Sequence, residues 1–193
     1  MSPSLTERSD PELAALALAG QQSAYAELMR RHRDAVFRLA RGHAGDATEA
    51  LDITQETFIS AFAALARYDG ARPFRLWIAR IAINKCHDWA RRRAVRRFFA
   101  FARPMEEAGA VADSAPSPEE AAHSQAELRR INAAIAGLPG NLKDVLVLRA
   151  IEGASQAEAA QILGISEKAV ETRLYRARNK LAEQLRDDGP GRV

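Results

Sequence analysis

The sequence predicts an all-α protein made of two small helical domains joined by a flexible linker. Ala, Leu, Arg and Glu outnumber Val, Thr and Tyr along the 193 residues, and such a composition favours helices. Apolar residues recur at helical spacing on both sides of a proline-containing stretch, residues 104–124. We therefore assign residues 1–103 to one domain, 104–124 to the linker and 125–193 to the second domain.

The charge of the chain changes along its length. Residues 1–103 carry 17 basic and 11 acidic side chains, and residues 125–193 carry 11 basic and nine acidic ones. Residues 104–124 hold five acidic residues, three prolines and no lysine or arginine. Two basic blocks thus flank an acidic stretch without apolar periodicity, which is typical of an extended linker.

Cysteine content and hydropathy limit where the protein acts. Cys86 is the single cysteine, so an internal disulfide is excluded, and the N-terminus lacks the charged and apolar succession of a signal peptide. No apolar run approaches the roughly 20 residues that cross a bilayer. We expect a protein of the reducing cytoplasm that is not inserted into a membrane.

Four helices are predicted in the N-terminal domain, and local signals mark the first two. Ser9-Asp10-Pro11-Glu12 offers a capping serine, an early proline and an acidic residue for the first turn of a helix. A second helix is predicted from about residue 23 to residue 41. Gly42 and Gly45 are expected to end it.

The third predicted helix, about residues 48–67, separates an apolar from a polar face. At 100° per residue, four side chains fall within one narrow stripe and are expected to face the core: Leu51, Phe58, Phe62 and Leu65. Asp52 and Glu56 lie about a third of a turn from this stripe, with Gln55 at its border. These three side chains stay available to a partner. Tyr68-Asp69-Gly70 then forms a short loop.

The fourth predicted helix begins near Pro73 and runs to Arg93 or beyond. Its core face is expected to bury Phe74, Trp77, Ile78 and Ile81. Beside that face runs a polar stripe of Arg80, Asn84, His87 and Arg91. The basic run continues to Arg97, with Tyr68 and Trp89 close by in sequence. Arginines beside aromatic rings are what single-stranded DNA requires, whereas an ordinary solvated surface is the alternative.

The C-terminal domain is expected to end in a helix-turn-helix. Earlier helices are predicted over about residues 121–136 and 141–151. Ser155-Gln156-Ala157-Glu158 then has the pattern of a capping box, Gly164 supplies a turn and Ser166 caps the last helix. The core stripe of that helix is expected to contain Val170, Leu174, Ala177 and Leu181.

The last helix has an outward face with the kinds of side chain that read DNA in a helix-turn-helix. These residues are Lys168, Glu171, Thr172, Tyr175 and Arg176, with Arg173, Arg178 and Lys180 on the flanks. Lysine and arginine can contact phosphates, and Thr172 or Glu171 could read base edges in the major groove. The alternative is an amphipathic helix with a solvated charged face.

Nothing in the sequence has the pattern of a catalytic or metal site. The four histidines, His32, His43, His87 and His123, lack metal-ligand spacing. The sequence also lacks a phosphate-cradling glycine loop, an HExxH motif and a GxSxG motif. We therefore expect no enzymatic activity, no catalytic residues, no bound metal and no cofactor.

Taken together, these stretches resemble the extracytoplasmic-function (ECF) sigma factors of bacterial RNA polymerase. Asp52-Ile-Thr-Gln-Glu-Thr-Phe58 is similar to the family's D-x-x-Q-E-x-F in region 2.2, and residues 74–93 are similar to regions 2.3 and 2.4. Residues 138–155 resemble region 4.1 and the start of region 4.2. Arg173-Leu-Tyr-Arg-Ala-Arg178 resembles the family's R-L-x-R-A-R, which lies in the major groove of the minus-35 element.

The resemblance implies a sigma region 2 helical bundle in the first domain and a sigma region 4 helix-turn-helix in the second. The residues implied to dock on the clamp helices of the polymerase's largest subunit are Asp52, Gln55 and Glu56. Those implied to bind the minus-ten element are Tyr68, Arg80, Asn84, His87, Arg91 and Arg92. Those implied to bind the minus-35 element are Lys168, Glu171, Thr172, Arg173 and Arg176.

One position departs from the family's pattern. Lys168-Ala169-Val170-Glu171 stands where the family usually has Gly-Thr-Val-Lys, so an acid replaces a base. Glu171 weakens the attraction to phosphate, although it could accept a hydrogen bond from cytosine N4.

The implied partners are core RNA polymerase, promoter DNA and an anti-sigma factor that clamps both domains. The apolar stretch from Phe98 to Phe101 is a candidate cover site for that factor, with packing on the domain or contact with a membrane surface as alternatives. Two other functions fit less of the sequence. One is a sigma-like decoy that binds an anti-sigma factor without binding DNA, and the other is a stand-alone helix-turn-helix regulator.

Overall fold

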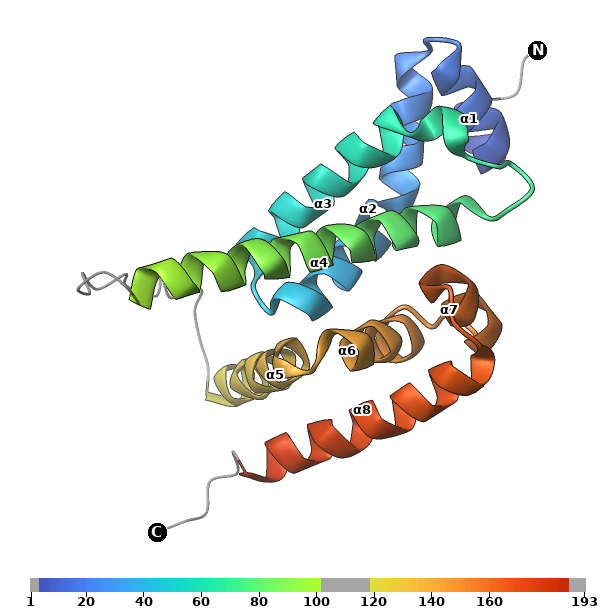
Figure 1. Ribbon diagram of the computed structural model, residues 1–193. Helices are drawn as coiled ribbons and strands as arrows, with labels where there is room; N and C mark the ends of the chain where they lie inside the picture. The colour runs from blue at the N-terminus through green and yellow to red at the C-terminus, as the bar shows by residue number, and fades with distance from the viewer. Residues whose placement is uncertain (1–3, 102–118, 188–193) are drawn as a thin grey trace.

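The computed structural model describes residues 4–101 and 119–187, and every regular element within these ranges is a helix. Eight α-helices and three short 3-10 or π turns follow one another, with no strand in the described part of the chain (Figure 1). The prediction of an all-α fold is confirmed. Residues 104–118 of the predicted linker lie outside the described residues. No helix in the described ranges has the length and apolarity to cross a bilayer.

Helices α1 (Asp10–Leu18) and α2 (Gln22–Ala44) begin the N-terminal domain. Ser9 and Glu12 form the predicted capping box at the start of α1. The Ser9 N–H donates to the Glu12 carboxylate at 2.7 Å, and the Glu12 N–H donates to Ser9 Oγ at 3.4 Å. The local sequence pattern was therefore sufficient to predict where α1 begins.

The end of α2 differs from the prediction at one of its two glycines. Gly42 continues the helix instead of ending it, and it is buried against Val147 of the C-terminal domain. Gly45 ends the helix in the left-handed conformation, with φ 76°, and its N–H donates to the carbonyl oxygen of Arg41 at 2.9 Å. The reason for a glycine at position 42 is thus a close approach between domains.

Helices α3 (Ala47–Ala63) and α4 (Phe74–Phe101) pack with α2 around the core of the N-terminal domain, and a 3-10 turn, Leu65–Arg67, follows α3. The largest fully buried side chains of this core are Leu13, Leu28, Leu39, Ile53, Leu65, Phe74 and Ile78. The predicted inward positions on α4 agree with this arrangement, because Phe74 and Ile78 are buried and Trp77 and Ile81 pack partly buried against the core.

The inward face of α3 differs from the prediction at Leu51. Leu51 is 48% exposed, whereas the buried residues of this helix are Ala50, Ile53, Thr54, Thr57, Phe58 and Ala61. Small side chains such as Ala50 and Ala61 let a neighbouring helix approach closely, so the buried stripe is centred on them and Leu51 turns outward. The predicted burial of Phe58 and Leu65 is confirmed.

The described part of the C-terminal domain, which ends at residue 187, contains four α-helices: α5 (Glu119–Gly137), α6 (Gly140–Leu146), α7 (Gln156–Leu163) and α8 (Glu167–Asp187). Helix α5 begins inside the stretch predicted as linker, so residues 119–124 are helical. A π turn, Val147–Ile151, replaces the second half of the helix predicted over residues 141–151. Such turns are rare and re-aim the side chains that they carry.

Helices α7 and α8 form the predicted helix-turn-helix. The Ser155 N–H donates to Glu158 at 2.8 Å, and the Glu158 N–H donates to Ser155 Oγ at 3.2 Å. Gly164 makes the turn with φ 66°, and Ser166 Oγ accepts from the Ala169 N–H at 3.2 Å. Each of these signals was readable in the sequence because each is local.

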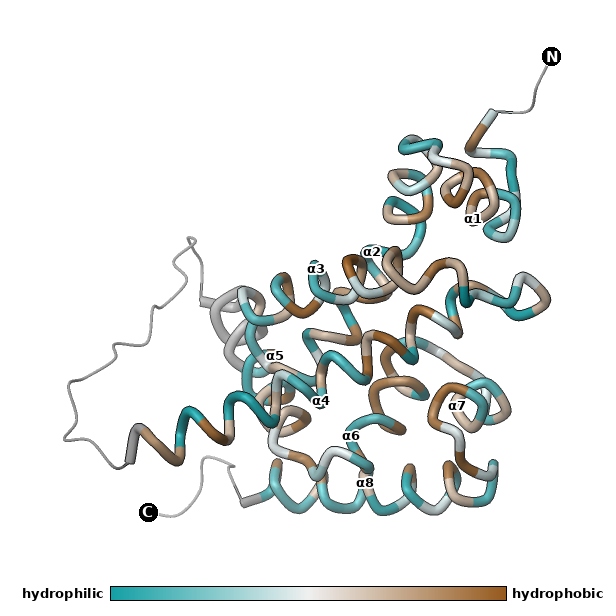
Figure 2. The backbone as a smooth tube through the Cα atoms, turned by 45° about the horizontal axis from the view of Figure 1, so that its top comes forward, coloured by the Kyte–Doolittle hydropathy of each residue, from teal (hydrophilic) through white to brown (hydrophobic). Residues whose placement is uncertain are grey.

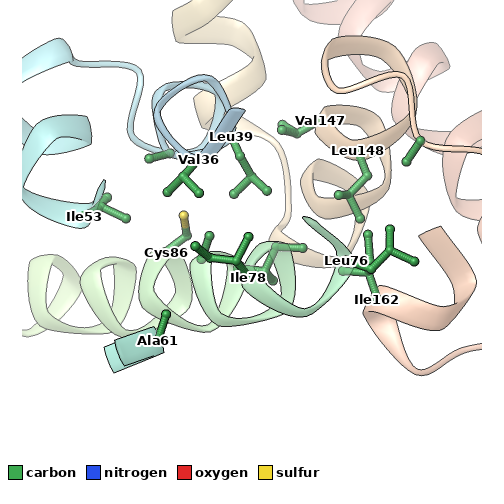
Figure 3. Close-up of a cluster of buried hydrophobic side chains, with 14 of the residues drawn as sticks. Val36, Leu39, Ile53, Ala61, Leu76, Ile78, Cys86, Val147, Leu148 and Ile162 are labelled. Carbon is green, nitrogen blue, oxygen red and sulfur yellow. The ribbon is translucent and has the colours of Figure 1, made fainter. Parts of the chain in front are cut away.

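The two domains pack against each other. In Figure 1 the helices α5 to α8 lie along one side of the α2–α4 bundle, with α8 outermost, and Figure 2 shows apolar stretches of α4, α6 and α7 in the middle of the molecule. Side chains from both domains meet in one buried cluster, where Val147, Leu148 and Ile162 approach Leu39 and Leu76 (Figure 3). The hydrophobic core is therefore continuous from one domain to the other.

Candidate nucleic-acid interface

One face of α3 carries the side chains predicted to dock on a partner. Asp52 and Gln55 are exposed, and Glu56 is half-exposed. Leu51 and Ile59, which are 48% and 62% exposed, lie beside them, and this apolar contribution was missed by the sequence reasoning. We call the five residues the α3 docking face. Its mixture of carboxylates and exposed aliphatic groups is typical of a protein-binding surface.

An ion pair joins this face to the basic end of α4. Arg92 Nη2 lies 2.9 Å and 3.0 Å from the two carboxylate oxygens of Glu56. The neighbouring Arg91 donates to Asp88 one turn earlier. Two of the three arginines predicted to bind the minus-ten element, Arg91 and Arg92, are therefore paired with carboxylates inside the protein. Because these pairs are exposed to solvent, each contributes little to stability and can be exchanged for another partner.

Aromatic residues gather where the loop after α3 enters α4. The Tyr68 ring centroid lies 5.1 Å from that of Phe74 and 5.3 Å from that of Trp77, and the Tyr68 hydroxyl donates to the carbonyl oxygen of Arg72 at 2.6 Å. Burial raises the pKa of Tyr68, with Asp10 contributing next. Phe74 and Trp89 are buried, so both are core residues. Tyr68 and Trp77 are only partly buried, so they are the two rings of this group that are candidates for stacking on a base.

The polar stripe of α4 faces the C-terminal domain across a cleft of about 520 Å³. Arg80, Asn84 and His87 line one wall of the cleft. The opposite wall comes from the C-terminal domain: Gly140, Asn141, Asp144, Ile162, Leu163 and Arg173. Arg80 Nη1 donates across the cleft to the carbonyl oxygen of Ile162 at 2.7 Å. The structure thus brings three predicted minus-ten residues together, and it places them against the other domain.

Two histidines from the N-terminal domain meet one aspartate from the C-terminal domain. Asp144 Oδ1 lies 2.9 Å from His43 Nε2 and 3.0 Å from His87 Nε2, and the Asp144 side chain is only 7% exposed. His43 Nδ1 lies 2.9 Å from the carbonyl oxygen of Leu39, which can only accept, so this nitrogen carries a proton.

Lys143 completes this cluster of charged groups. Its ammonium donates to the carbonyl oxygens of Ala136 and His43, and burial lowers its pKa. No sequence pattern predicts this cluster, because 101 and 57 residues separate Asp144 from His43 and His87. Among the described residues, no group of three or more His, Cys, Asp or Glu side chains has the arrangement of a metal site.

The outward face of α8 presents the predicted minus-35 residues. Lys168, Glu171, Thr172 and Arg176 are exposed together with Tyr175. Lys168 Nζ lies 2.9 Å from Glu171 Oε2, so the acid that departs from the family's pattern neutralises the lysine beside it. Arg173 differs from the others, since it is half-buried and turned toward the cleft between the domains.

Two protein families match the chain. The family described as Sigma-70 region 2 matches residues 28–96, which contain most of α2, all of α3 and most of α4. The family described as Sigma-70, region 4 matches residues 128–181, which run from α5 into α8. The two matches follow the order of the two helical domains.

Two proteins with known roles resemble the chain over most of its length. The RNA polymerase sigma factor CnrH of Cupriavidus metallidurans is 42% identical over 185 residues, which are 94% of this chain and 97% of that protein. The ECF RNA polymerase sigma factor SigW of Bacillus subtilis is 33% identical and covers 87% of this chain and 92% of its own length. The solved structure of CnrH in complex with the cytosolic domain of CnrY matches with a TM-score of 0.68 at 36% identity, over 93% of this chain and 99% of that one.

Proposed function

The chain belongs to the extracytoplasmic-function group of RNA polymerase sigma factors, and on that premise we propose how its surfaces divide the work of promoter recognition. It binds core RNA polymerase and directs promoter-specific initiation of transcription. The observation that carries the assignment is that sigma regions 2 and 4 occur in one chain, in that order and on two helical domains. A stand-alone helix-turn-helix regulator would have no use for region 2.

The α3 docking face is our proposed contact with core polymerase. It gathers Asp52, Gln55 and Glu56 on one exposed helix surface, and the aliphatic groups of Leu51 and Ile59 extend it. Carboxylates steer a basic partner into place, while buried aliphatic contacts at the centre of an interface supply affinity.

The minus-ten element is proposed to lie along α4 and the loop before it. Arg80, Asn84 and His87 offer hydrogen-bond donors on one stripe, and Arg91 and Arg92 extend the positive charge. Tyr68 lies in the loop before α4 and is only partly buried, and its ring is the proposed stacking partner of an unstacked base. Capture of such a base offsets the few kcal/mol that unpairing costs, so opening the duplex requires no chemical step by the sigma factor. We accordingly propose that the chain has no enzymatic activity of its own.

Helix α8 is proposed to enter the major groove of the minus-35 element. Thr172 and Arg176 lie on the outward face, where a recognition helix reads base edges. The pairing of Lys168 with Glu171 reduces the positive charge at the start of α8. We therefore propose that base recognition at this point uses a hydrogen bond from the N4 amino group of a cytosine to Glu171. Arg173 lines the cleft between the two domains, so it can contact this groove only after α8 moves away from the N-terminal domain.

An anti-sigma factor is the proposed regulator, and the cytoplasm is the proposed site of action. CnrH was solved in complex with the cytosolic domain of CnrY. In this chain, the side chains of Phe98 and Phe99 are 74% and 65% exposed on a basic stretch of α4, and such an apolar patch is a candidate cover site for a partner. A decoy that binds an anti-sigma factor without touching DNA remains the alternative function.

Transcription in vitro tests the proposal against both alternatives. Purified chain is added to core polymerase on genomic fragments, and the 5′ ends of the transcripts are mapped. We expect discrete start sites that are absent with core polymerase alone. A decoy gives no starts, and a stand-alone regulator gives no starts without another sigma factor. Binding to core polymerase without any specific start would contradict the proposal.

A further inference from the structure

A second cleft lies beside the C-terminal end of α2, on the opposite side of His43 and Asp144 from Arg80. It has a volume of about 500 Å³, and its lining residues come from α2 and α4 on one side and from α5 and α6 on the other. A cleft of this size accommodates a small molecule. Much of its wall consists of small side chains that leave the space open: Ala44, Ala90, Ala94, Ala133 and Ala136.

Positive charge dominates the lining of this cleft. Arg93, Arg97 and Lys143 line it, and Asp46 is the one carboxylate among its described lining residues. We call the space lined by these four residues the basic cleft. Asp46 is already committed to the start of α3, because its Oδ1 accepts a hydrogen bond from the Glu49 N–H at 3.0 Å. The cleft therefore has an excess of positive charge.

Lys143 is the buried cation of the basic cleft. Its ammonium donates to the carbonyl oxygens of Ala136 and His43. Burial lowers the pKa of Lys143, and the positive charge of Arg93 lowers it further, although Asp144 acts in the opposite direction. The cations of the two walls are thus close enough to repel each other, and a bound anion would relieve this repulsion.

Arg93 and Arg97 are exposed and lie one helical turn apart on α4, a spacing that places their Cβ atoms about 5–6 Å from each other. The Arg93 guanidinium lies 5.1 Å from the centroid of the Trp89 ring. That ring is buried, and its indole N–H donates to Glu49, so it provides a fixed platform for the guanidinium. Arginine binds phosphate through two parallel hydrogen bonds. Two such groups at this spacing suit two phosphoryl groups that are linked to each other.

We propose that the basic cleft binds a diphosphate, a small anion with two linked phosphoryl groups. Arg93 and Arg97 contact the phosphoryl groups from α4, and Lys143 adds its charge from the opposite wall. None of these three cations is among the proposed promoter contacts, so the site goes beyond the proposed function. Because the walls come from both domains, the bound anion stabilises the folded chain by mass action.

Isothermal titration calorimetry on the full-length chain tests the proposal. The probes are sodium pyrophosphate, inorganic phosphate and guanosine diphosphate, each at the same ionic strength. We expect one pyrophosphate to bind per chain. Its affinity should exceed that of inorganic phosphate at least about tenfold, which is the effect of one additional charge-assisted hydrogen bond. The nucleotide identifies the source of the ligand: equal or tighter binding indicates a nucleoside diphosphate, and weaker binding indicates free pyrophosphate.

Two kinds of variant should remove the site. Arg93→Gln combined with Arg97→Gln takes away both guanidinium groups, and Ala133→Glu places a carboxylate on the wall that α5 contributes. All three residues are exposed, so the fold is expected to persist, as circular dichroism verifies. We expect each of these variants to bind pyrophosphate at least about tenfold more weakly than the wild type. Pyrophosphate should raise the Tm of the wild type and should not raise that of the variants.

Matched controls carry the same changes of charge outside the cleft. Arg33→Gln combined with Arg96→Gln removes two exposed arginines from α2 and α4, and Ala182→Glu adds a carboxylate to the exposed surface of α8. Both controls are expected to bind pyrophosphate like the wild type. If one of the cleft variants does not fold, the other one decides the result.

Two results would overturn the proposal. One is the absence of saturable pyrophosphate binding to the wild type, or binding that the cleft variants and the controls weaken equally. The other is that Arg93→Gln combined with Arg97→Gln weakens only the binding of a double-stranded oligonucleotide, measured by fluorescence anisotropy, while pyrophosphate binds neither protein. The two arginines would then serve DNA and not a small anion.

Discussion

At the scale of single residues, Arg31 and Glu27 hold the N-terminal segment on α2. Arg31 Nε donates to Glu27 at 2.8 Å, and Arg31 Nη1 donates to Asp10 at 3.0 Å. The guanidinium also donates to the carbonyl oxygens of Leu5, Thr6 and Arg8. Hydrogen bonds from Arg30 and then Arg31 lower the pKa of Glu27 from an ordinary 4.5 to about 2.

The lowered pKa of Glu27 makes part of the stability depend on pH. Because the folded value lies below the unfolded one, the ionised carboxylate favours the folded state. Its contribution is complete above pH 4.5 and is lost as the pH falls toward 2. We predict that Glu27→Gln makes the free energy of unfolding less dependent on pH in this window, as measured by urea denaturation. Glu183→Gln, on the exposed surface of α8, should parallel the wild type, and a parallel curve for Glu27→Gln would refute the prediction.

Residues that meet only in the folded chain could not be predicted from the sequence. His43, His87 and Asp144 come from α2, α4 and α6, and no spacing in the sequence links them. The opposite holds for Ser155 and Glu158, whose reciprocal contacts span three residues and follow from the local pattern. The exposure of Asp52 and Gln55, which stay predicted polymerase contacts, could likewise be predicted, because it is determined by one helical face.

At the scale of elements, the α3 docking face separates partner binding from folding. Its residues are exposed or half-exposed, so their substitution is expected to change the stability of the domain by less than about 0.5 kcal/mol each. The prediction that Leu51 faces the core was wrong for a reason that concerns the packing of the whole helix. Periodicity locates an apolar stripe, but the close packing of Ala50 and Ala61 decides which side of α3 turns inward.

Removal of both carboxylates from this face should weaken polymerase binding. We predict that Asp52→Ala combined with Glu56→Ala costs about 2 kcal/mol or more of binding free energy, about 30-fold in affinity, because interface anchors of this kind carry most of the energy. Surface plasmon resonance with immobilised core polymerase measures the change. The single variant Asp52→Ala keeps the contact between Glu56 and Arg92 and should account for part of the loss.

A matched double variant checks that charge alone is not the cause. Asp34→Ala combined with Glu183→Ala removes the same number of exposed carboxylates from α2 and α8. This control is expected to bind polymerase like the wild type. Undiminished binding by the Asp52 and Glu56 double variant would place the docking surface elsewhere.

At the scale of the whole molecule, the two domains share one buried cluster. Val147 and Leu148 of the π turn pack with Leu39 and Leu76, and α7 adds Ile162 (Figure 3). Sequence patterns identified both domains and most helices, yet they gave no indication of this contact. Helical periodicity reports that a face is apolar, and it does not report which other element covers that face.

The shared cluster predicts cooperative unfolding. We expect differential scanning calorimetry to show one transition for the wild type, because the loss of either domain exposes apolar surface of the other. Gly42→Ala should divide it into two transitions, while α2 gains up to about 1 kcal/mol of helix propensity. Gly140→Ala, where an added Cβ meets nothing within 4 Å, should keep the single transition. One unchanged transition in Gly42→Ala would show that the domains tolerate the methyl group in place.

Helices α2 and α4 turn arginines and histidines toward the C-terminal domain. These contacts affect how the protein binds to chromosomal DNA in the cell. Groups that are already engaged displace few counterions from DNA, so we expect the unassembled subunit to bind random duplex weakly. Most copies then diffuse freely and meet polymerase at a rate set by their number. Competition among sigma factors for core polymerase would accordingly depend on their copy numbers and not on how much of each is bound nonspecifically to DNA.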